Sequence, residues 1–455
     1  MALDLTDIQG LIHHFYPYPM TRHLLFQIGN PAAGMNLLKH LAPLTNAADP
    51  LSSTRESLLN VGITYGGLKA LGVRTSILKA FPDDFRDEPA QITMGDFEAS
   101  NPSKWWNGKF KTQQVHLVVH LFGKSVEALE QMTAIVRTAA VGNQELLPTI
   151  KQGPIEGKWL GDTPGELHFG YHDGISHPAV RWDDDPIQEG EVDYRHFILG
   201  YSTGEIPSTP PAFGSDPDSV RAGELVRNGT YSVFRWLHQD VASFNSFLNT
   251  EGPKVFPELS LKDAEELLAA KLMGRWRDGT PLVSSPTAPN TALSKSDNFG
   301  YALDDPDGLK CPFSAHIRVT NPRDQVLNHL ITLTGGVPRV IRRGTPYGPK
   351  LTGTVDDGEE RGLVGMFLCA NIRRQYYKLA AWMKVNDFSP AFPNQHAQDP
   401  LANRETPDAS DQFLIPTATG DRTVTLPDFV ITKGTAFFLL PGLQTLQKLA
   451  DGGFR

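Results

Sequence analysis

The chain has 455 residues, of which 40% are hydrophobic, and a formal net charge of −9 at pH 7. This length exceeds one ordinary domain and favours two, with enough apolar residues for a sizeable core. The acidic balance and the lack of a basic block argue against a nucleic-acid partner and favour a soluble protein.

Neither the first residues of the chain nor its cysteines point to a membrane or an oxidising compartment. Residues 1–7 include an early acidic residue and no cationic segment before an apolar run, so they do not predict a signal peptide. No window approaches the roughly 20 apolar residues that span a bilayer. Cys311 and Cys369 are the only cysteines, too few for a disulfide framework. We expect no membrane partner and a cytoplasmic location, or a secreted one if a leader was removed.

The first 140 residues predict strands that are each followed by a helix. Alternating or continuous apolar runs indicate the strands, and apolar spacing of three to four residues indicates the helices. The strands are predicted at 23–28, 58–65 and 114–122, and the helices at 33–41, 66–72 and 125–139. Two strand-helix-strand halves of this kind form a ferredoxin-like sheet.

The same pattern recurs in the second half of the chain. A strand at 228–237 runs into a helix that begins at 241, and the ranges 327–333 and 362–371, with a helix through Trp382, supply later elements. The predicted fold is therefore α+β, with two duplicated ferredoxin-like domains of the dimeric α+β barrel type and antiparallel sheets. The domains are predicted at 1–215, which includes a loop-rich stretch, and 216–455.

The loop-rich stretch between the two copies, 153–217, holds a short polar and aromatic motif at 168–178. Gly170 and Gly174 flank three residues and allow a tight or left-handed bend that presents Asp173. Asp173 then either points into a cavity or caps nearby backbone N–H groups in an Asx-turn or at a helix start. The aromatic residues interleaved through the stretch favour an ordered conformation.

Two later segments add to this motif. His316 stands among small and apolar residues and is followed by a basic run, and Arg342 and Arg343 end a predicted strand before a Pro-Tyr-Gly turn at 346–348. A Gly-x-x-Asp-Gly motif, a later His and an Arg before such a turn, in this order, resemble the dye-decolourising peroxidases. The ordered triplet is more specific than any one of the three, and the resemblance covers most of the chain.

This resemblance implies an oxidoreductase that carries haem b in its C-terminal half. It implies His316 as the axial ligand of the iron, Asp173 as the distal proton shuttle and Arg342 as the stabiliser of developing charge. The implied reaction reduces hydrogen peroxide through an oxoferryl intermediate and oxidises phenols, aromatic amines and bulky dyes. A monomer or a homodimer is expected on the same ground.

Several neighbours are expected to touch the cofactor. Strand alternation points Arg342 and Arg343 in opposite directions, and we expect Arg343 to reach a haem propionate. Arg318 and Arg323 are further propionate candidates, with surface salt bridges as the alternative. His172 and Ile175, which flank Asp173 and Gly174, are also expected at the cofactor.

The hydrogen-bond partner of the axial histidine is not evident from the sequence. Such a ligand needs its second nitrogen bonded to a carbonyl or carboxylate oxygen. In the segment 370–375, Arg373 occupies the place where relatives often carry an acid. Asp387 and Asn371 are the remaining candidates.

A second departure lies at Gly365, where relatives tend to place a phenylalanine over the distal haem face. The pocket is then either more open, or Phe367 or Met366 fills the space; a strand bulge is the alternative explanation.

Bulky dyes cannot enter a small pocket, so their oxidation implies an electron path to a surface aromatic. Tyr347 matches the position of a surface tyrosine that relatives use in this way, and Trp382 lies near a corresponding tryptophan. The alternative for both is ordinary packing.

Two other functions compete with peroxidase turnover, namely haem iron release and haem carriage. A carrier needs an axial ligand but no proton shuttle, so the presence of both Asp173 and Arg342 argues against carriage. No feature of the sequence separates iron release from peroxidase activity.

Overall fold

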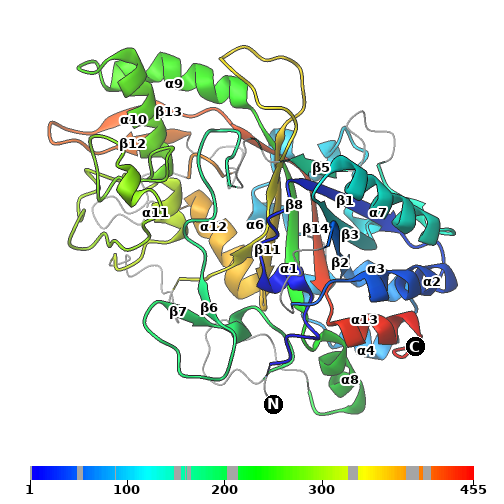
Figure 1. Cartoon of the computed structure of the whole chain (residues 1–455). Helices are drawn as coiled ribbons and strands as arrows, with labels where there is room; N and C mark the ends of the chain where they lie inside the picture. Colours follow the sequence, from blue (N-terminus) through cyan, green and yellow to red (C-terminus); the bar gives the residue numbers. More distant parts are fainter. Residues whose placement is uncertain are drawn as a thin grey trace.

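A ten-stranded sheet runs through the centre of the protein (Figure 1). The computed structural model describes residues 3–48, 55–87, 89–147, 155–158, 160, 165–201, 214–325, 337–385, 399–402 and 411–455. The strand order is β10-β11-β8-β14-β2-β3-β1-β4, with β5 paired to β1 and β9 paired to β11. All of these pairings are antiparallel.

The N-terminal half forms as the sequence predicts. Its strands are β1 (Met20–Gln27), β2 (Ser57–Ile63) and β3 (Leu117–Gly123), and its main helices are α2 (Pro31–Leu41) and α7 (Val126–Ala139). The helices start where side chains cap them: the Asn30 side chain accepts from the Ala33 N–H, and the Ser125 side chain accepts from the Ala128 N–H. The three predicted strands and these two helices are therefore confirmed.

The C-terminal half supplies β8 (Thr230–Gln239), β11 (Gly362–Cys369) and helix α9 (Val241–Val255), which also confirm predicted elements. Its long strand β14 (Val430–Leu440) was not among the predictions. This strand pairs with β8 along its length and reaches β2 through Leu439 and Ile63, so it joins the two halves into one sheet. The predicted range 327–333 lies outside the described residues, and the domain boundary after residue 215 stays a prediction.

Apart from the 13-residue helix α10, the remaining elements are short. The strands are β4 (Gln144–Glu145), β5 (Ile155–Lys158), β6 (Ala179–Arg181), β7 (Glu191–Asp193), β9 (Ile341–Arg342), β10 (Thr345–Tyr347), β12 (Gln412–Ile415) and β13 (Arg422–Thr425). The helices are α1 (Gly10–His13), α3 (Tyr65–Ala70), α4 (Thr75–Lys79), α5 (Asp83–Arg86), α6 (Gln91–Met94), α8 (Pro217–Val226), α10 (Leu261–Met273), α11 (His316–Thr320), a π-helical turn (Ile372–Tyr377), α12 (Lys378–Val385) and α13 (Leu443–Ala450).

The two faces of the sheet are covered differently. Helices α2, α7 and α13 pack around the N-terminal strands, while α9 to α12 gather beside the other half (Figure 1). These helices lie on one face of the sheet. The other face is covered by irregular segments around residues 8–18, 105–115 and 194–198. Among the described residues, no helix combines the length and the apolar character that crossing a membrane requires.

Two histidines lie inside this irregularly covered face. His23 on β1 is directly opposite His120 on β3, and their Nδ1 atoms are 2.8 Å apart. Both rings are buried, and neither Nε2 has a hydrogen-bond partner within the described part of the chain. Burial lowers the pKa of His23 to about 3 and that of His120 well below its ordinary value. The folded protein therefore holds both rings neutral.

This pair predicts a loss of stability in acid. Below the ordinary histidine pKa of about 6.5, the unfolded chain binds protons that the folded pair does not, which lowers the free energy of unfolding by about 1.4 kcal/mol per pH unit for each histidine. Denaturant titrations at a series of pH values from 7 to 4 measure the free energy of unfolding. Its decrease with falling pH should be shallower in the double variant His23→Leu, His120→Leu than in the wild type. The exposed His40, changed to Leu, is the control and should leave the slope unchanged. Equal slopes in the double variant and the wild type would contradict the assignment.

Candidate active site

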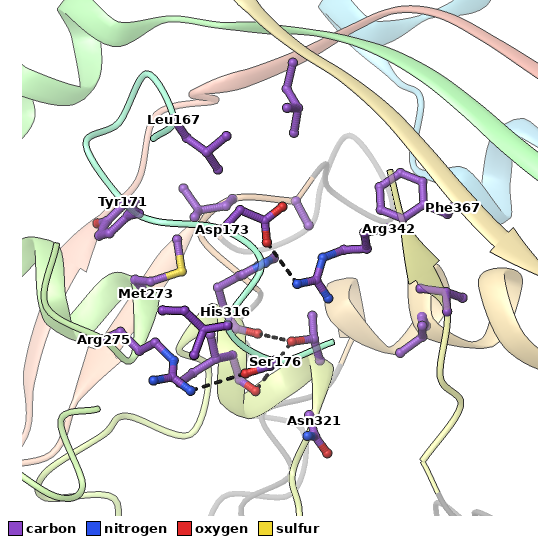
Figure 2. Close-up of a pocket in the computed structure, with 18 of the residues that line it drawn as sticks. Leu167, Tyr171, Asp173, Ser176, Met273, Arg275, His316, Asn321, Arg342 and Phe367 are labelled. Carbon is purple, nitrogen blue, oxygen red and sulfur yellow. Dashed lines mark hydrogen bonds and ion pairs between the residues drawn. The ribbon is translucent and has the colours of Figure 1, made fainter. Parts of the chain in front are cut away.

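A cavity of about 320 Å³ lies between the sheet and the segments around helices α10, α11 and α12. This volume is in the range of small-molecule and cofactor sites. Its wall includes Asp173, His316 and Arg342, which are far apart in the sequence (Figure 2). The structure therefore brings the three residues of the sequence motif to one site.

Asp173 and Arg342 form an ion pair at the cavity wall. Arg342 Nη2 donates to Asp173 Oδ1 at 2.9 Å (Figure 2). The N–H of Gly174 donates to the same oxygen at 2.7 Å. Gly170 and Gly174 have φ angles of 87° and 90°, so the predicted left-handed bend is present on both sides of the carboxylate. Of the alternatives left open for Asp173, the first is realised, because Asp173 lines the cavity, whereas its bond to the N–H of the next residue is neither an Asx-turn nor a helix cap.

The ion pair sets the charge of Asp173. Burial alone raises the pKa of this carboxyl group, but the Arg342 charge and hydrogen bond outweigh burial and hold the pKa at about 2. His177, four residues further on, lies within electrostatic range of both groups, and burial lowers its pKa to about 4. At neutral pH the cavity wall thus carries a carboxylate and a guanidinium, with the neutral imidazole of His177 nearby.

His316 begins helix α11 and has a carboxylate partner that the sequence did not reveal. Its Nδ1 lies 2.7 Å from Oδ2 of Asp399, whose side chain is fully buried and whose Oδ1 accepts from the Leu401 N–H at 2.9 Å. Burial lowers the pKa of His316, but the Asp399 charge and hydrogen bond outweigh burial and raise it overall. A carboxylate oxygen accepts a hydrogen bond, so Nδ1 of His316 is the donor in this pair. In the neutral ring the proton then sits on Nδ1, and Nε2 keeps its lone pair for a metal.

The two earlier candidates for this partner do not take the role. Asn371 instead caps the π-helical turn, where its side chain accepts from the Arg374 N–H at 2.9 Å, so that prediction is wrong. Asp387 lies outside the described residues. Asp399 stands 83 positions after His316, and no local pattern in the sequence marks it.

An arginine-rich group forms another part of the cavity wall. Arg275 Nη2 donates to Asp297 Oδ1 at 2.8 Å, and Arg323 pairs with the same carboxylate. Ser176 Oγ also donates to this oxygen, at 2.6 Å. Arg339 lies on the same wall. Three guanidinium groups near one carboxylate leave this region positive, as a site for carboxylate groups of a ligand requires.

Two of the predicted cofactor contacts are wrong. Arg343 points to the opposite face of the sheet and donates to the carbonyl oxygens of Leu11 and Ile12 at 2.8 and 3.0 Å. Arg318 is fully buried in an ion pair with Asp305 at 2.9 Å. Neither side chain lines the cavity. Both arginines hold the fold together, Arg343 by tying the N-terminal segment to the sheet.

Other predicted positions do lie at the cavity. His172 and Ile175 both line it, as does Arg323. The space at Gly365 is taken by Phe367, because a Cβ added to Gly365 would lie 2.7 Å from the Phe367 ring. Met366 is buried on the other face of the sheet. Of the alternatives left open for this position, Phe367 fills the space.

Tyr347 and Trp382 were the two aromatic residues expected at the surface. Tyr347 is only 4% exposed, and its hydroxyl lies 3.4 Å from Glu360 Oε1, so its prediction as a surface residue is wrong. Tyr347 is buried because its strand, β10, pairs with β11. The backbone of Trp382 belongs to α12, but its side chain lies outside the described part of the structure.

Comparison with known proteins shows which proteins this chain is similar to. No family model matches the chain. A dye-decolorizing peroxidase of Exidia glandulosa is 27% identical over 466 residues, which cover 98% of this chain and 87% of that protein. The structure of an ancestral D-type dye-decolorizing peroxidase superposes with a TM-score of 0.83 at 26% identity, over 99% of this chain and all of that one. A dye-decolorizing peroxidase in complex with 2,6-dimethoxyphenol gives a TM-score of 0.78 at 25% identity, over 98% of this chain and all of that one.

The chain is similar to dye-decolourising peroxidases over nearly its whole length, in sequence and in fold. It is therefore a peroxidase with the α+β fold of that family. The family implies a haem cofactor, and the cavity fits one. Its wall offers His316, whose bond to Asp399 through Nδ1 leaves Nε2 as the nitrogen for a metal, an arginine group suited to two propionates, and apolar side chains for the porphyrin faces. Within the described residues, no group of three or more ionisable side chains forms a competing metal site.

The His316–Asp399 pair leads to a prediction for this peroxidase. Asp399→Asn keeps an acceptor for the Leu401 N–H but removes the negative charge that raises the pKa of His316. We expect haem affinity or activity to fall roughly 10- to 100-fold, as for other partners of metal-binding histidines, and the Fe(III)/Fe(II) midpoint potential to rise. A redox titration with haem quantification measures both, with the exposed Asp307→Asn as control. An unchanged midpoint potential would show that Asp399 does not tune the ligand.

Proposed function

We propose that this protein is a haem b peroxidase that reduces hydrogen peroxide through the oxoferryl route and oxidises phenols, aromatic amines and bulky dyes. The observation that carries the proposal is the arrangement of one cavity that holds both a carboxylate-bonded histidine and an ion-paired Asp173 and Arg342. A relative was solved with 2,6-dimethoxyphenol, which supports a phenolic donor.

The cavity residues would hold haem in a defined orientation. His316 would bind the iron through Nε2, and Arg275, Arg323 and Arg339 would pair with the propionates. His172 and Ile175 would contact the ring beside the Asp173 bend. When bound, the iron supplies the electrons that cleave the peroxide O–O bond.

Asp173 is the proton shuttle in this proposal. Its pKa of about 2 keeps it ionised, so it can accept the proton of an incoming peroxide and return it to the leaving oxygen as water forms. Arg342 remains cationic and stabilises the negative charge that develops on the leaving oxygen. Each peroxide consumed takes two electrons and two protons from two donor molecules and yields two waters.

Haem carriage and haem iron release are the alternatives. A carrier gains nothing from a preorganised carboxylate and guanidinium facing the ligand, whereas peroxide cleavage requires a proton acceptor and a charge stabiliser. The ion pair in the cavity therefore favours peroxidase turnover over carriage. Iron release would instead leave an iron-free porphyrin after peroxide treatment, which absorption spectroscopy distinguishes.

The first test separates the roles of the two distal residues. Asp173→Asn removes the proton acceptor and should slow the peroxide reaction about 10²- to 10⁴-fold at every pH. Arg342→Leu removes charge stabilisation, which costs about 3 to 4 kcal/mol in comparable sites. It also removes the group that lowers the pKa of Asp173, so the acid limb of the pH profile should move to higher pH. Stopped-flow absorption across acid pH measures both effects.

The exposed Asp185→Asn serves as the matched control and should react as the wild type does. An acid limb that stays in place in Arg342→Leu would contradict the claim that Arg342 tunes Asp173.

A second test addresses the axial ligand. His316→Ala should abolish stable haem retention, because it removes the imidazole that is proposed to bind the iron. The haem-to-protein ratio after gel filtration and the Soret band measure retention, with His40→Ala as an exposed control. Normal stoichiometry and an unchanged Soret band in His316→Ala would remove His316 from this role.

A further inference from the structure

Helix α11, which begins with His316, is too short to hold its own position. It has five residues, and no side chain caps its start. A helix of this length is unstable alone, because its first turn fixes several residues for a single backbone hydrogen bond. The direction of the His316 imidazole therefore depends on contacts between the rest of the helix and the surrounding chain.

Arg318 makes such contacts on the side of the helix away from the cavity. Residues two apart on a helix point to different sides, and of His316 and Arg318 only His316 lines the cavity. Arg318 Nη1 donates to Asp305 Oδ2 at 2.9 Å and to the Cys311 carbonyl at 2.7 Å. Nη2 donates to the Asp305 carbonyl at 2.9 Å, and Nε donates to Gln325 Oε1 at 2.7 Å. These acceptors lie both before and after α11 in the chain, so one side chain fastens both flanks of the helix.

Two aromatic rings also contact the guanidinium group. Arg318 Cζ lies 4.3 Å from the ring centroid of Tyr301 and 4.4 Å from that of Phe313. Both rings and the arginine side chain are buried. Contacts of this kind favour a defined orientation of the planar guanidinium. The rings thereby restrict the group that donates the four hydrogen bonds.

Asp305, the carboxylate partner of Arg318, is itself fixed in place. It is buried, its Oδ1 accepts from the Lys310 N–H at 2.9 Å, and its Oδ2 accepts from the Cys311 N–H at 2.8 Å. Lys271 of α10 donates to two carbonyl oxygens of the same loop, at 2.7 and 2.8 Å. The loop is thus closed by its own carboxylate and tied to α10, and it gives Arg318 a firm anchor.

The bond between His316 and Asp399 depends on this anchor. Asp399 comes from a distant part of the chain, and its Oδ2 lies 2.7 Å from Nδ1 of His316. A rotation or shift of α11 would lengthen this bond and turn the imidazole, because the helix has no cap of its own. The anchored guanidinium opposes such a movement from the other side of the helix.

We propose that Arg318 is the positioning residue of the axial ligand: its buried bonds set the orientation of α11 and so keep the His316 imidazole bonded to Asp399 and directed at the haem iron. This inference rests on the proposed function, in which His316 binds the iron. It replaces the expectation that Arg318 contacts a propionate with a role behind the ligand.

Arg318→Lys tests this role, because it keeps the positive charge but loses the planar fork. A lysine ammonium is one compact donor and cannot reach Asp305, Cys311 and Gln325 together. The variant should bind haem roughly 10- to 100-fold more weakly, as for other residues that orient a metal-binding histidine. Its Fe(III)/Fe(II) midpoint potential should rise, and the iron–histidine stretching band of the ferrous protein should move to lower frequency, because Asp399 then raises the basicity of the imidazole less. Haem titration, redox potentiometry and resonance Raman spectroscopy measure the three effects.

Arg361→Lys is the matched control. Arg361 is also a buried arginine that donates to a carboxylate, Asp357, at 2.6 Å and to the Pro349 carbonyl at 3.0 Å, and it does not line the cavity. This variant should keep the wild-type midpoint potential and iron–histidine band, whatever its unfolding temperature. A shift in both readouts for Arg318→Lys alone therefore reports on the ligand and not on a general loss of stability.

A double variant separates positioning from loosening of the fold. In Asp399→Asn, the carboxylate with which Arg318 aligns the imidazole is gone. Adding Arg318→Lys to that variant should raise the midpoint potential much less than it does in the wild type. Equal shifts in the two backgrounds would overturn the proposal, as would an unchanged potential and band in a folded Arg318→Lys variant.

The outcomes also separate this inference from the function on which it rests. If the wild type shows no iron–histidine band, or if His316→Ala retains it, the proposed ligand is wrong and the positioning role fails with it. If His316→Ala loses the band and Arg318→Lys leaves it unchanged, only the role of Arg318 is wrong. Should Arg318→Lys not fold, Phe313→Leu takes its place. It keeps every hydrogen bond of Arg318 and removes one aromatic contact, so it should cause smaller shifts in the same directions.

Discussion

The ion pair between Asp173 and Arg342 joins two parts of the chain that have little else in common. Asp173 stands on a glycine bend in the loop-rich stretch, and Arg342 stands on a short strand at the edge of the central sheet. Their contact anchors the loop against the sheet and defines one wall of the cavity. It also fixes the protonation of the carboxylate, because burial without the guanidinium would favour the neutral acid.

A second charged contact orders the opposite part of the site. Asp399 is fully buried and bonds both His316 and a backbone N–H, so its charge is compensated although it has left water. One pair thus keeps a carboxylate ionised, and the other raises the basicity of an imidazole. A haem group between the two would meet a strong donor on one side and a proton acceptor with a cation on the other, which is the division of labour that peroxide cleavage needs.

The sequence predicted what depends on local pattern. The strands β1, β2, β3, β8 and β11 follow from apolar alternation, and Asp173, His316 and Arg342 from short motifs with characteristic neighbours. Asp399 could not be predicted in this way, since its contact with His316 depends on how distant segments pack. The same holds for Arg343 and Tyr347, whose burial is set by the irregular segments that cover the far face of the sheet. Strand β14, which unites the two halves, was not predicted although its apolar run marks it.

The central claim is that this cavity binds haem through His316 and directs peroxide toward Asp173 and Arg342. The most direct measurement is the absorption spectrum of the haem-loaded protein before and after one equivalent of hydrogen peroxide. The account predicts a rapid shift to a high-valent spectrum that returns to the resting one when a phenol is added. Loss of the Soret band with release of iron, or no change at all, would contradict it.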